Sequence, residues 1–260
     1  MPGPSTVFLM YHELEVPGRA LCQAEAGYAR YAVSEREFRE QVQHLKESGQ
    51  RGVNVREALK FSSSSSVAIT FDDGSETDLL TAARILREVG FNATFYVTTG
   101  WLGQPGRLSI AQLQELASLE FEIGCHSMTH AYLSDLDDRA LQHETAEAKS
   151  RLEEIIGKPV DHFSCPGGRY NGRVAEAARG AGYRTVATSR IHANSPSSDK
   201  FALGRVAILR GLSVNSFASI CSGDALPRLR AQSSLREAAR CVLGNSRYDR
   251  VRSILLGSEE

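Results

Sequence analysis

The sequence lacks the marks of disulfide-rich domains, thiolate zinc clusters and membrane proteins. Its five cysteines are odd in number, widely scattered and never spaced as Cys-x-x-Cys, so neither disulfides nor cysteine-bound zinc organise the fold. No stretch approaches the ~20 apolar residues of a membrane-spanning helix. The first residues, MPGPSTVFLMYHE, have neither the basic charge nor the apolar length of a signal peptide. A reducing, cytoplasmic location is therefore expected, with no transmembrane segment.

An excess of charge of one sign is also missing. The chain has 30 Lys and Arg against 31 Asp and Glu, a formal net charge of −1, whereas proteins that bind nucleic acid usually carry a basic excess. We therefore expect no nucleic-acid partner. With 260 residues the chain is long enough to bury a large core. No pattern in it predicts the oligomeric state.

The chain does contain a regular alternation of short apolar runs and segments of helical periodicity. Seven runs are expected as strands: Val7–Tyr11, Val67–Phe71, Ala93–Thr98, Phe121–Cys125, His162–Cys165, Tyr183–Thr188 and Leu203–Leu209. Repeated βα units predict an α/β fold, a closed or nearly closed (β/α) barrel of about seven parallel strands with an outer ring of helices. Ser34 and Glu37 predict the start of one helix, and the five serines Ser62–Ser66 predict a surface loop.

Polar residues follow two of these expected strands, at the barrel end where functional side chains gather. Asp72 and Asp73 follow one strand, and His126 and His130 follow another. Adjacent buried carboxylates repel each other unless a cation or a proton-transfer role compensates them. Two imidazoles four residues apart and one carboxylate would provide three metal ligands and leave positions for water and substrate. One aspartate is then expected to bind a metal and the other to accept a proton from water.

These residues resemble the motifs of a known family. TFDDG at Thr70–Gly74 and HSMTH at His126–His130 look like the first two motifs of the polysaccharide deacetylase family, carbohydrate esterase family four. LMYHE, FNATFYVTTGWLG, LEEIIGKPV, FSCPGGRYN, AGYRTVATS and ALGRVAI are also similar to that family, so the resemblance runs from Val7 to about Ile220. It implies a distorted (β/α) barrel that hydrolyses N-acetyl groups from amino sugars of a cell-surface polysaccharide or its precursor glycan.

The resemblance also implies roles for individual residues. By motif position Asp73, His126 and His130 would bind one divalent metal ion, and Asp72 would be the general base. Two imidazoles and a carboxylate favour zinc, although they would also accept cobalt, nickel, manganese or iron.

The third motif departs from the family pattern. The family usually has Arg-x-Pro-Tyr-Gly where this chain has Ser-Cys-Pro-Gly-Gly at Ser164–Gly168, so the arginine that commonly steadies the catalytic aspartate is missing. Arg169 is a candidate to reach that aspartate instead, although the sequence leaves open what replaces the missing arginine, and we expect the backbone N–H of Gly167 to help stabilise the oxyanion. Pro166, Arg169 and Trp101 are expected to bind substrate. Trp101 has a simpler alternative, which is packing between a strand and a helix.

The last family motif, an apolar strand ending in a catalytic histidine, is absent from the carboxyl-terminal half. The segment Val7–His12 has this form at the front of the chain, and the first and last strands of a closed barrel are neighbours. We expect His12 to be the general acid that protonates the leaving amine, with His192 as its rival.

Two other functions stay open beside the metal-dependent N-deacetylase. One is a catalytically silent glycan-binding module of the same fold, which the altered third motif would favour. The other is a deacetylase-like amidase acting on a non-sugar C–N bond. We expect a barrel domain over residues 1–222 and an arginine-rich helical extension over residues 223–260. This extension is expected to pack on or beside the barrel, and its basic face is the place for any peripheral membrane contact.

Overall fold

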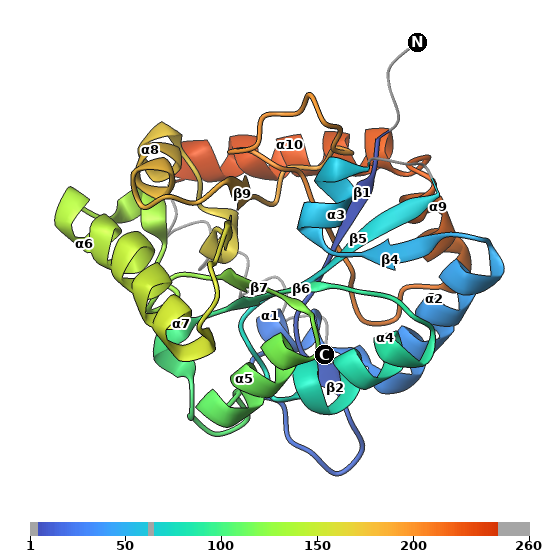
Figure 1. Ribbon diagram of the computed structural model, residues 1–260. Helices are drawn as coiled ribbons and strands as arrows, with labels where there is room; N and C mark the ends of the chain where they lie inside the picture. The colour runs from blue at the N-terminus through green and yellow to red at the C-terminus, as the bar shows by residue number, and fades with distance from the viewer. Residues whose placement is uncertain (1–4, 62–64, 244–260) are drawn as a thin grey trace.

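A parallel sheet curls inside a layer of helices in the computed structural model, which describes residues 5–61 and 65–243 (Figure 1). Seven strands follow one another around this sheet: β10 (Val206–Ala207), β1 (Val7–Tyr11), β5 (Ser66–Phe71), β6 (Thr94–Val97), β7 (Glu122–Cys125), β8 (His162–Ser164) and β9 (Thr185–Ala187). An eighth, β4 (Arg51–Val53), pairs with the first half of β5. All these pairings are parallel. The predicted (β/α) barrel is confirmed.

The sheet closes through the segment that precedes β10. Leu203 forms an isolated parallel bridge with Ala187 at the end of β9, and β10 pairs with β1. The expected strand Leu203–Leu209 is therefore only two residues long, because its first residue bonds to β9 and its middle bonds to β1. Arg205 lies at this crossing from one neighbour to the other.

Helices surround the sheet on its outer side (Figure 1). They are α1 (Ala26–Ala29), α2 (Glu35–Glu47), α3 (Val55–Lys60), α4 (Arg84–Glu88), α5 (Ile110–Ser118), α6 (Asp138–Gln142), α7 (Ala148–Ile156), α8 (Gly172–Gly180), α9 (Val214–Cys221) and α10 (Leu226–Leu243). Helix α2 begins as predicted, because Ser34 and Glu37 form a reciprocal capping box. A second small sheet joins β2 (Leu14–Glu15) to β3 (Val33–Ser34).

Two helical segments contain wider π-helical turns. The turn η1 (Asp78–Ala83) leads into α4, and η4 (His143–Glu147) lies between α6 and α7. Shorter 3₁₀ turns follow several strands: η2 (Thr99–Trp101), η3 (Leu133–Asp135) and η5 (Pro166–Gly168). Hydrophobic periodicity cannot reveal a π turn, which is rare and often lies at a functional site.

Aromatic stacking fixes which way the strand ends face. The ring of Phe71 stacks on Tyr11 at 5.2 Å and on Phe95 at 5.1 Å, so a row of stacked rings joins the three neighbouring strands β1, β5 and β6. Tyr11 also contacts Phe38 of α2, which places these rings on the helix-facing side. Since successive residues of an extended strand point to opposite sides, the next residue after each strand turns toward the barrel interior.

The carboxyl-terminal helix α10 packs on the barrel through its first turns, where Leu226 and Leu229 contact the hydrophobic core. The remainder of the expected arginine-rich extension, residues 244–260, lies outside the described residues, and the domain division at residue 222 stays a prediction. Ser62–Ser64 of the expected serine loop also lie outside them, whereas Ser66 already belongs to β5.

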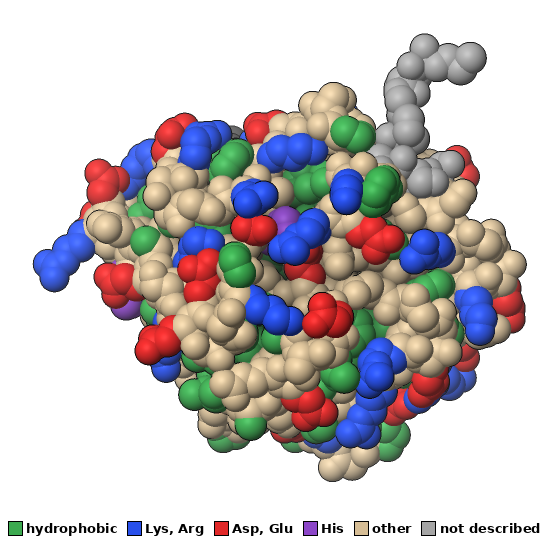
Figure 2. Space-filling model, viewed as in Figure 1, with side chains coloured by type: hydrophobic (Ala, Val, Ile, Leu, Met, Phe, Trp, Pro, Cys, Tyr) green, Lys and Arg blue, Asp and Glu red, His purple; other side chains and the backbone are tan. Residues whose placement is uncertain are grey.

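Two surface properties concern possible partners. On the face seen in Figure 2, basic and acidic side chains alternate without a large patch of one sign. Among the helices of the described residues, none is both long and apolar enough to cross a bilayer.

Candidate functional site

Asp73, His126 and His130 meet at the carboxyl end of the barrel. Asp73 Oδ1 lies 3.5 Å from His126 Nε2 and 3.4 Å from His130 Nε2, and the three ligand atoms all lie within 4.8 Å of one another. Asp73 Oδ1 is buried without a hydrogen-bond partner. An orphaned buried acceptor between two imidazoles is what a small cation would stabilise. The residues present therefore fit one divalent metal ion.

Unusual backbone conformations turn these three side chains toward one point. Asp73, Ser127 and His130 all have positive φ angles, of 84°, 68° and 65°, a region that residues other than glycine rarely adopt. Gly74 follows with φ of 80°, and a Cβ there would lie 3.0 Å from Val97 Cγ1. Strain of this kind is concentrated at functional sites.

Surrounding contacts prepare His126 for metal binding. Its Nδ1 lies 3.0 Å from the carbonyl oxygen of Ser164, so Nδ1 carries the proton and Nε2 keeps its lone pair. Burial lowers the pKa of His126 to about 4, against the opposing influence of Asp72. The imidazole is consequently neutral near pH 7, the form that ligates a metal.

His130 is held by aromatic stacking. Its ring stacks on Trp101 at 4.9 Å, and the Arg107 guanidinium lies 4.2 Å over the Trp101 ring. Arg107 Nη1 also lies 3.7 Å from Asp73 Oδ2, the oxygen that does not face the histidines. Trp101 is half-buried among these groups, and its expected contact with substrate stays a prediction.

Asp72 is paired with a buried arginine that sequence reasoning missed. Arg205 Nη1 and Nη2 donate to the two Asp72 oxygens at 2.7 and 2.8 Å, and Arg205 Nη2 also donates to Ser164 Oγ at 2.7 Å. Arg205, and not the candidate Arg169, takes this place. The Arg169 guanidinium instead lies 4.5 Å over the ring of Tyr132. Burial raises the pKa of Asp72, but Arg205 and His126 outweigh it and bring the pKa below its usual value.

Small residues in the third motif allow Arg205 to take the place of the arginine that the family pattern has there. Ser164 stands where the family's arginine would be expected, and its short side chain leaves room for the guanidinium that arrives from the segment before β10. Gly167, where a tyrosine would be expected, has φ of 57°. A Cβ on Gly167 would lie 2.9 Å from Tyr132 Cε1. A tyrosine from another loop therefore packs where the motif has none, and Pro166 next to Gly167 is buried.

His12 lies beside Asp72 because β1 and β5 are paired in register. Tyr11 pairs with Phe71, and the Asp72 N–H donates to the Tyr11 carbonyl at 3.0 Å. Burial lowers the pKa of His12, while Asp73 and Asp72 act in the opposite direction. The structure thus brings His12 to the rim that carries the metal-binding candidates.

His192 lies elsewhere, against Gly204 and Arg230. Two residues after it, Asn194 bridges to Thr6, the residue before β1. His192 therefore belongs to a segment at the amino end of β1, away from the end where Asp72 and His12 lie.

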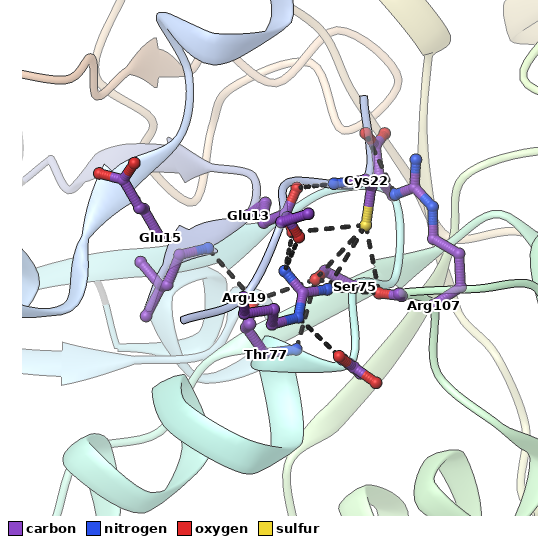
Figure 3. A network of polar contacts seen from close by, with 12 residues as sticks. Glu13, Glu15, Arg19, Cys22, Ser75, Thr77 and Arg107 are labelled. Atoms are coloured by element: carbon purple, nitrogen blue, oxygen red, sulfur yellow. Dashed lines mark hydrogen bonds and ion pairs between the residues drawn. The ribbon is translucent and has the colours of Figure 1, made fainter. Parts of the chain in front are cut away.

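A polar network fixes the chain that follows His12 (Figure 3). The buried carboxylate of Glu13 pairs with Arg19 and accepts hydrogen bonds from the Cys22 N–H at 2.9 Å and the Tyr28 hydroxyl at 2.8 Å. Arg19 continues to Glu76 Oε1 at 2.6 Å and to the Gly106 carbonyl at 2.9 Å. The segment after β1 is thereby tied to the loops after β5 and β6 and forms a wall beside the site.

The sequence contains only a partial signal for the site residues that the sequence patterns did not predict. Arg205 is a single charge in the apolar stretch ALGRVAI, which suggests a buried partner without naming it. Tyr132 and Arg107 lie in loops, where spacing carries no information on contacts.

Comparison with known proteins agrees with this geometry. Residues 61–186 match the family model for polysaccharide deacetylase. The chain is 28% identical over 215 residues to the Bacillus subtilis protein "Putative polysaccharide deacetylase YxkH", across 80% of this chain and 73% of that protein. It is 34% identical over 121 residues to the peptidoglycan-N-acetylglucosamine deacetylase of Bacillus cereus, across 46% of this chain and 54% of that protein.

The fold also matches solved structures. The Streptococcus pyogenes deacetylase PplD, in complex with acetate, superposes with a TM-score of 0.74 at 22% identity, covering 84% of this chain and 98% of that one. At this identity the superposition shows that the two folds are alike. The similarity in sequence is the match of residues 61–186 to the family model. Through these residues the chain is similar to the polysaccharide deacetylase family.

Proposed function

We propose that the chain is a metal-dependent hydrolase that removes N-acetyl groups from amino sugars of a cell-surface polysaccharide or its precursor glycan. The observation that carries the proposal is the convergence of Asp73 Oδ1 and two imidazole nitrogens around one point, with an arginine-paired Asp72 beside them. The name of the Bacillus cereus relative supports a glycan that contains N-acetylglucosamine.

Asp73, His126 and His130 would hold the divalent ion, for which zinc is the first choice. When bound, such an ion polarises a carbonyl and makes water a better nucleophile. Asp72 is the proton acceptor, because Arg205 and Ser164 hold it ionised and fixed in direction. Its Oδ2 lies 3.9 Å from His126 Nε2, which puts the base next to the ligands without competing for their place.

His12 and Gly167 complete the proposed machinery. His12 is neutral near pH 7, since burial lowers its pKa, so it must take up the proton that becomes available in the site before passing it to the leaving amine. Gly167 lies exposed at the rim after β8, where its backbone N–H would stabilise the oxyanion. Arg169 and Pro166, on either side of it, are proposed to line the substrate cleft. The cytoplasmic location expected from the sequence stays a prediction.

The two alternatives differ in how much supports them. A silent glycan-binding module was favoured by the missing third-motif arginine, and Arg205 now supplies a guanidinium to Asp72. That reason for a silent module is therefore gone. An amidase acting on a non-sugar C–N bond would use the same ligands and base, so only substrates separate it from a deacetylase.

Acetate release tests the proposal directly. Purified full chain is incubated with N-acetylglucosamine oligomers, with a panel of formamides and cyclic imides as comparison substrates. Acetate should appear from the oligomers, stop when a chelator removes divalent ions and return when zinc is added. Release of no acetate under any of these conditions would reject the deacetylase, and turnover of the non-sugar amides alone would favour the amidase.

A further inference from the structure

Glu144 holds the loop that joins the two histidines, and it does so from a helix outside the site. Its side chain is buried, with 4% exposed. Its Oε2 accepts hydrogen bonds from the N–H groups of Met128 and Thr129, both at 2.9 Å, and its Oε1 accepts one from the Thr129 hydroxyl at 2.6 Å. Three donors from residues between His126 and His130 thus converge on one carboxylate.

The loop needs support because two of its residues are strained. Ser127 and His130 both adopt left-handed φ angles, and such conformations persist only when their surroundings fix them. On one side the loop is held by backbone bonds, from the N–H of Thr99 to the Ser127 carbonyl at 3.1 Å and from the N–H of Gly100 to the Met128 carbonyl at 2.8 Å. Glu144 adds further support by accepting hydrogen bonds from the N–H groups of Met128 and Thr129.

The π turn η4 gives Glu144 its inward direction. Its neighbours His143 and Glu147 are exposed and bond to each other, with His143 Nδ1 2.7 Å from Glu147 Oε2. Glu144 and Thr145 of the same turn are buried. One turn therefore contains a carboxylate directed at the histidine loop and another directed at solvent, which makes Glu147 a matched control.

We propose that Glu144 is a positioning residue that sets the separation of His126 and His130 and, through it, the affinity and geometry of the metal site. The inference rests on the proposed function, because it takes these histidines as metal ligands. Hydrogen-bonding partners behind metal ligands typically change metal affinity by about 10–100-fold when they are removed. An alanine at position 144 would leave the N–H groups of Met128 and Thr129 unpaired and free the loop to relax.

The test compares zinc affinity in the full chain, measured by competition with a chromophoric chelator. Glu144→Ala should weaken zinc binding by about 10–100-fold. Glu144→Gln should weaken it less, because the amide oxygen can still accept the two N–H groups. Glu147→Gln should leave it unchanged. The visible absorption of the Co²⁺-loaded protein should change in Glu144→Ala and stay unchanged in Glu147→Gln, a difference that reduced stability alone would not cause.

Two controls keep the outcomes separate. Thr129→Val removes only the hydroxyl donor of an exposed residue, so it serves as the folded variant if Glu144→Ala does not fold, and it should weaken zinc binding by a smaller factor. Glu144→Gln and Thr129→Val proteins with wild-type affinity and cobalt spectrum would overturn the inference and leave the proposed function standing. A wild-type chain that binds zinc no better than Asp73→Ala would reject the proposed function and the inference with it.

Discussion

The two ends of the barrel contain the same kinds of polar side chain in different arrangements. At the amino end the first residues of four neighbouring strands are buried and polar: Thr94, Glu122, His162 and Thr185. The Thr94 hydroxyl donates to Glu122 Oε2 at 2.6 Å, and His162 Nδ1 lies 2.8 Å from Thr185 Oγ1. His162 Nε2 lies 3.1 Å from Glu122 Oε1. At the carboxyl end, in contrast, Asp73 Oδ1 faces two imidazole nitrogens, His126 Nε2 at 3.5 Å and His130 Nε2 at 3.4 Å.

The comparison teaches that a buried histidine and carboxylate do not by themselves mark a metal site. At the amino end the Thr94 hydroxyl donates to one Glu122 oxygen and a single imidazole lies beside the other, so protein groups alone face this carboxylate from both sides. At the carboxyl end the Nε2 atoms of His126 and His130 and the Asp73 oxygen face one another, and all three are acceptors when the imidazoles are neutral. Acceptors that converge without a donor leave a place for a cation.

The largest expected difference between the two ends is in turnover. Asp72→Asn removes the proposed proton acceptor without changing its size, and it should lower kcat for acetate release by about 10²–10⁴-fold while zinc still binds. Glu122→Gln changes a buried carboxylate at the other end and should keep kcat near the wild-type value. Initial rates on N-acetylglucosamine oligomers measure both. An equal loss in the two variants would contradict separate roles for the two ends.

The second comparison concerns two histidines. His12 follows β1 beside Asp72, whereas His192 belongs to the segment near the amino end of β1. His12→Ala should lower kcat by about 10²-fold or more, since it removes the proposed general acid, and His192→Ala should change it little. Both variants should bind zinc like the wild type. Near-normal turnover of His12→Ala together with loss in His192→Ala would show that the acid is assigned to the wrong end.

A third variant breaks the ion pair of Asp72, whose arginine comes from a different segment than in the family pattern. Arg205 and Asp72 are both buried, and removing one partner of such a pair typically costs about 3–5 kcal/mol. Arg205→Met should therefore lower the free energy of unfolding by this amount, as measured with urea. Adding Ser164→Arg should recover part of the stability and activity, because it returns an arginine to the family's position. A double variant no better than Arg205→Met would show that the two positions are not interchangeable.

The smallest expected effect is on stability in acid, without added metal. The unfolded chain protonates His126 near pH 6.5, but burial lowers the native pKa to about 4. Between these values the unfolded state binds more protons, so stability falls as pH falls, by at most ~3 kcal/mol. Urea unfolding at pH 7 and pH 4.5 measures the fall. The fall in unfolding free energy should be smaller in His126→Gln than in the wild type, and the exposed control His143→Gln should show the same fall as the wild type. An equal fall in all three proteins would contradict the role given to His126.

Local patterns predicted most of the fold and the metal-binding candidates. Apolar runs located the strands because a buried parallel strand must be apolar on both faces, and the register of β1 and β5 then brought His12 next to Asp72. The capping pair of Ser34 and Glu37 marked a helix start for a local reason, since both partners lie within one turn.

Contacts between distant segments were not predictable in the same way. Arg205 and Asp72 are 133 residues apart, and nothing local tells which arginine fills the space beside Ser164. Arg169 was the nearer choice in sequence, but its guanidinium lies over Tyr132. Glu144 was missed because helical periodicity assumes regular turns, and a π turn changes the direction of every side chain in it.

Zinc stoichiometry tests the central claim most directly. The full chain is loaded with zinc, freed of excess ion and analysed for metal, together with Asp73→Ala from the carboxyl end and Glu122→Gln from the amino end. We predict one zinc ion per wild-type chain, one per Glu122→Gln chain and none in Asp73→Ala. A wild-type chain without zinc, or an Asp73→Ala chain that retains its ion, would contradict the claim that Asp73, His126 and His130 share one cation.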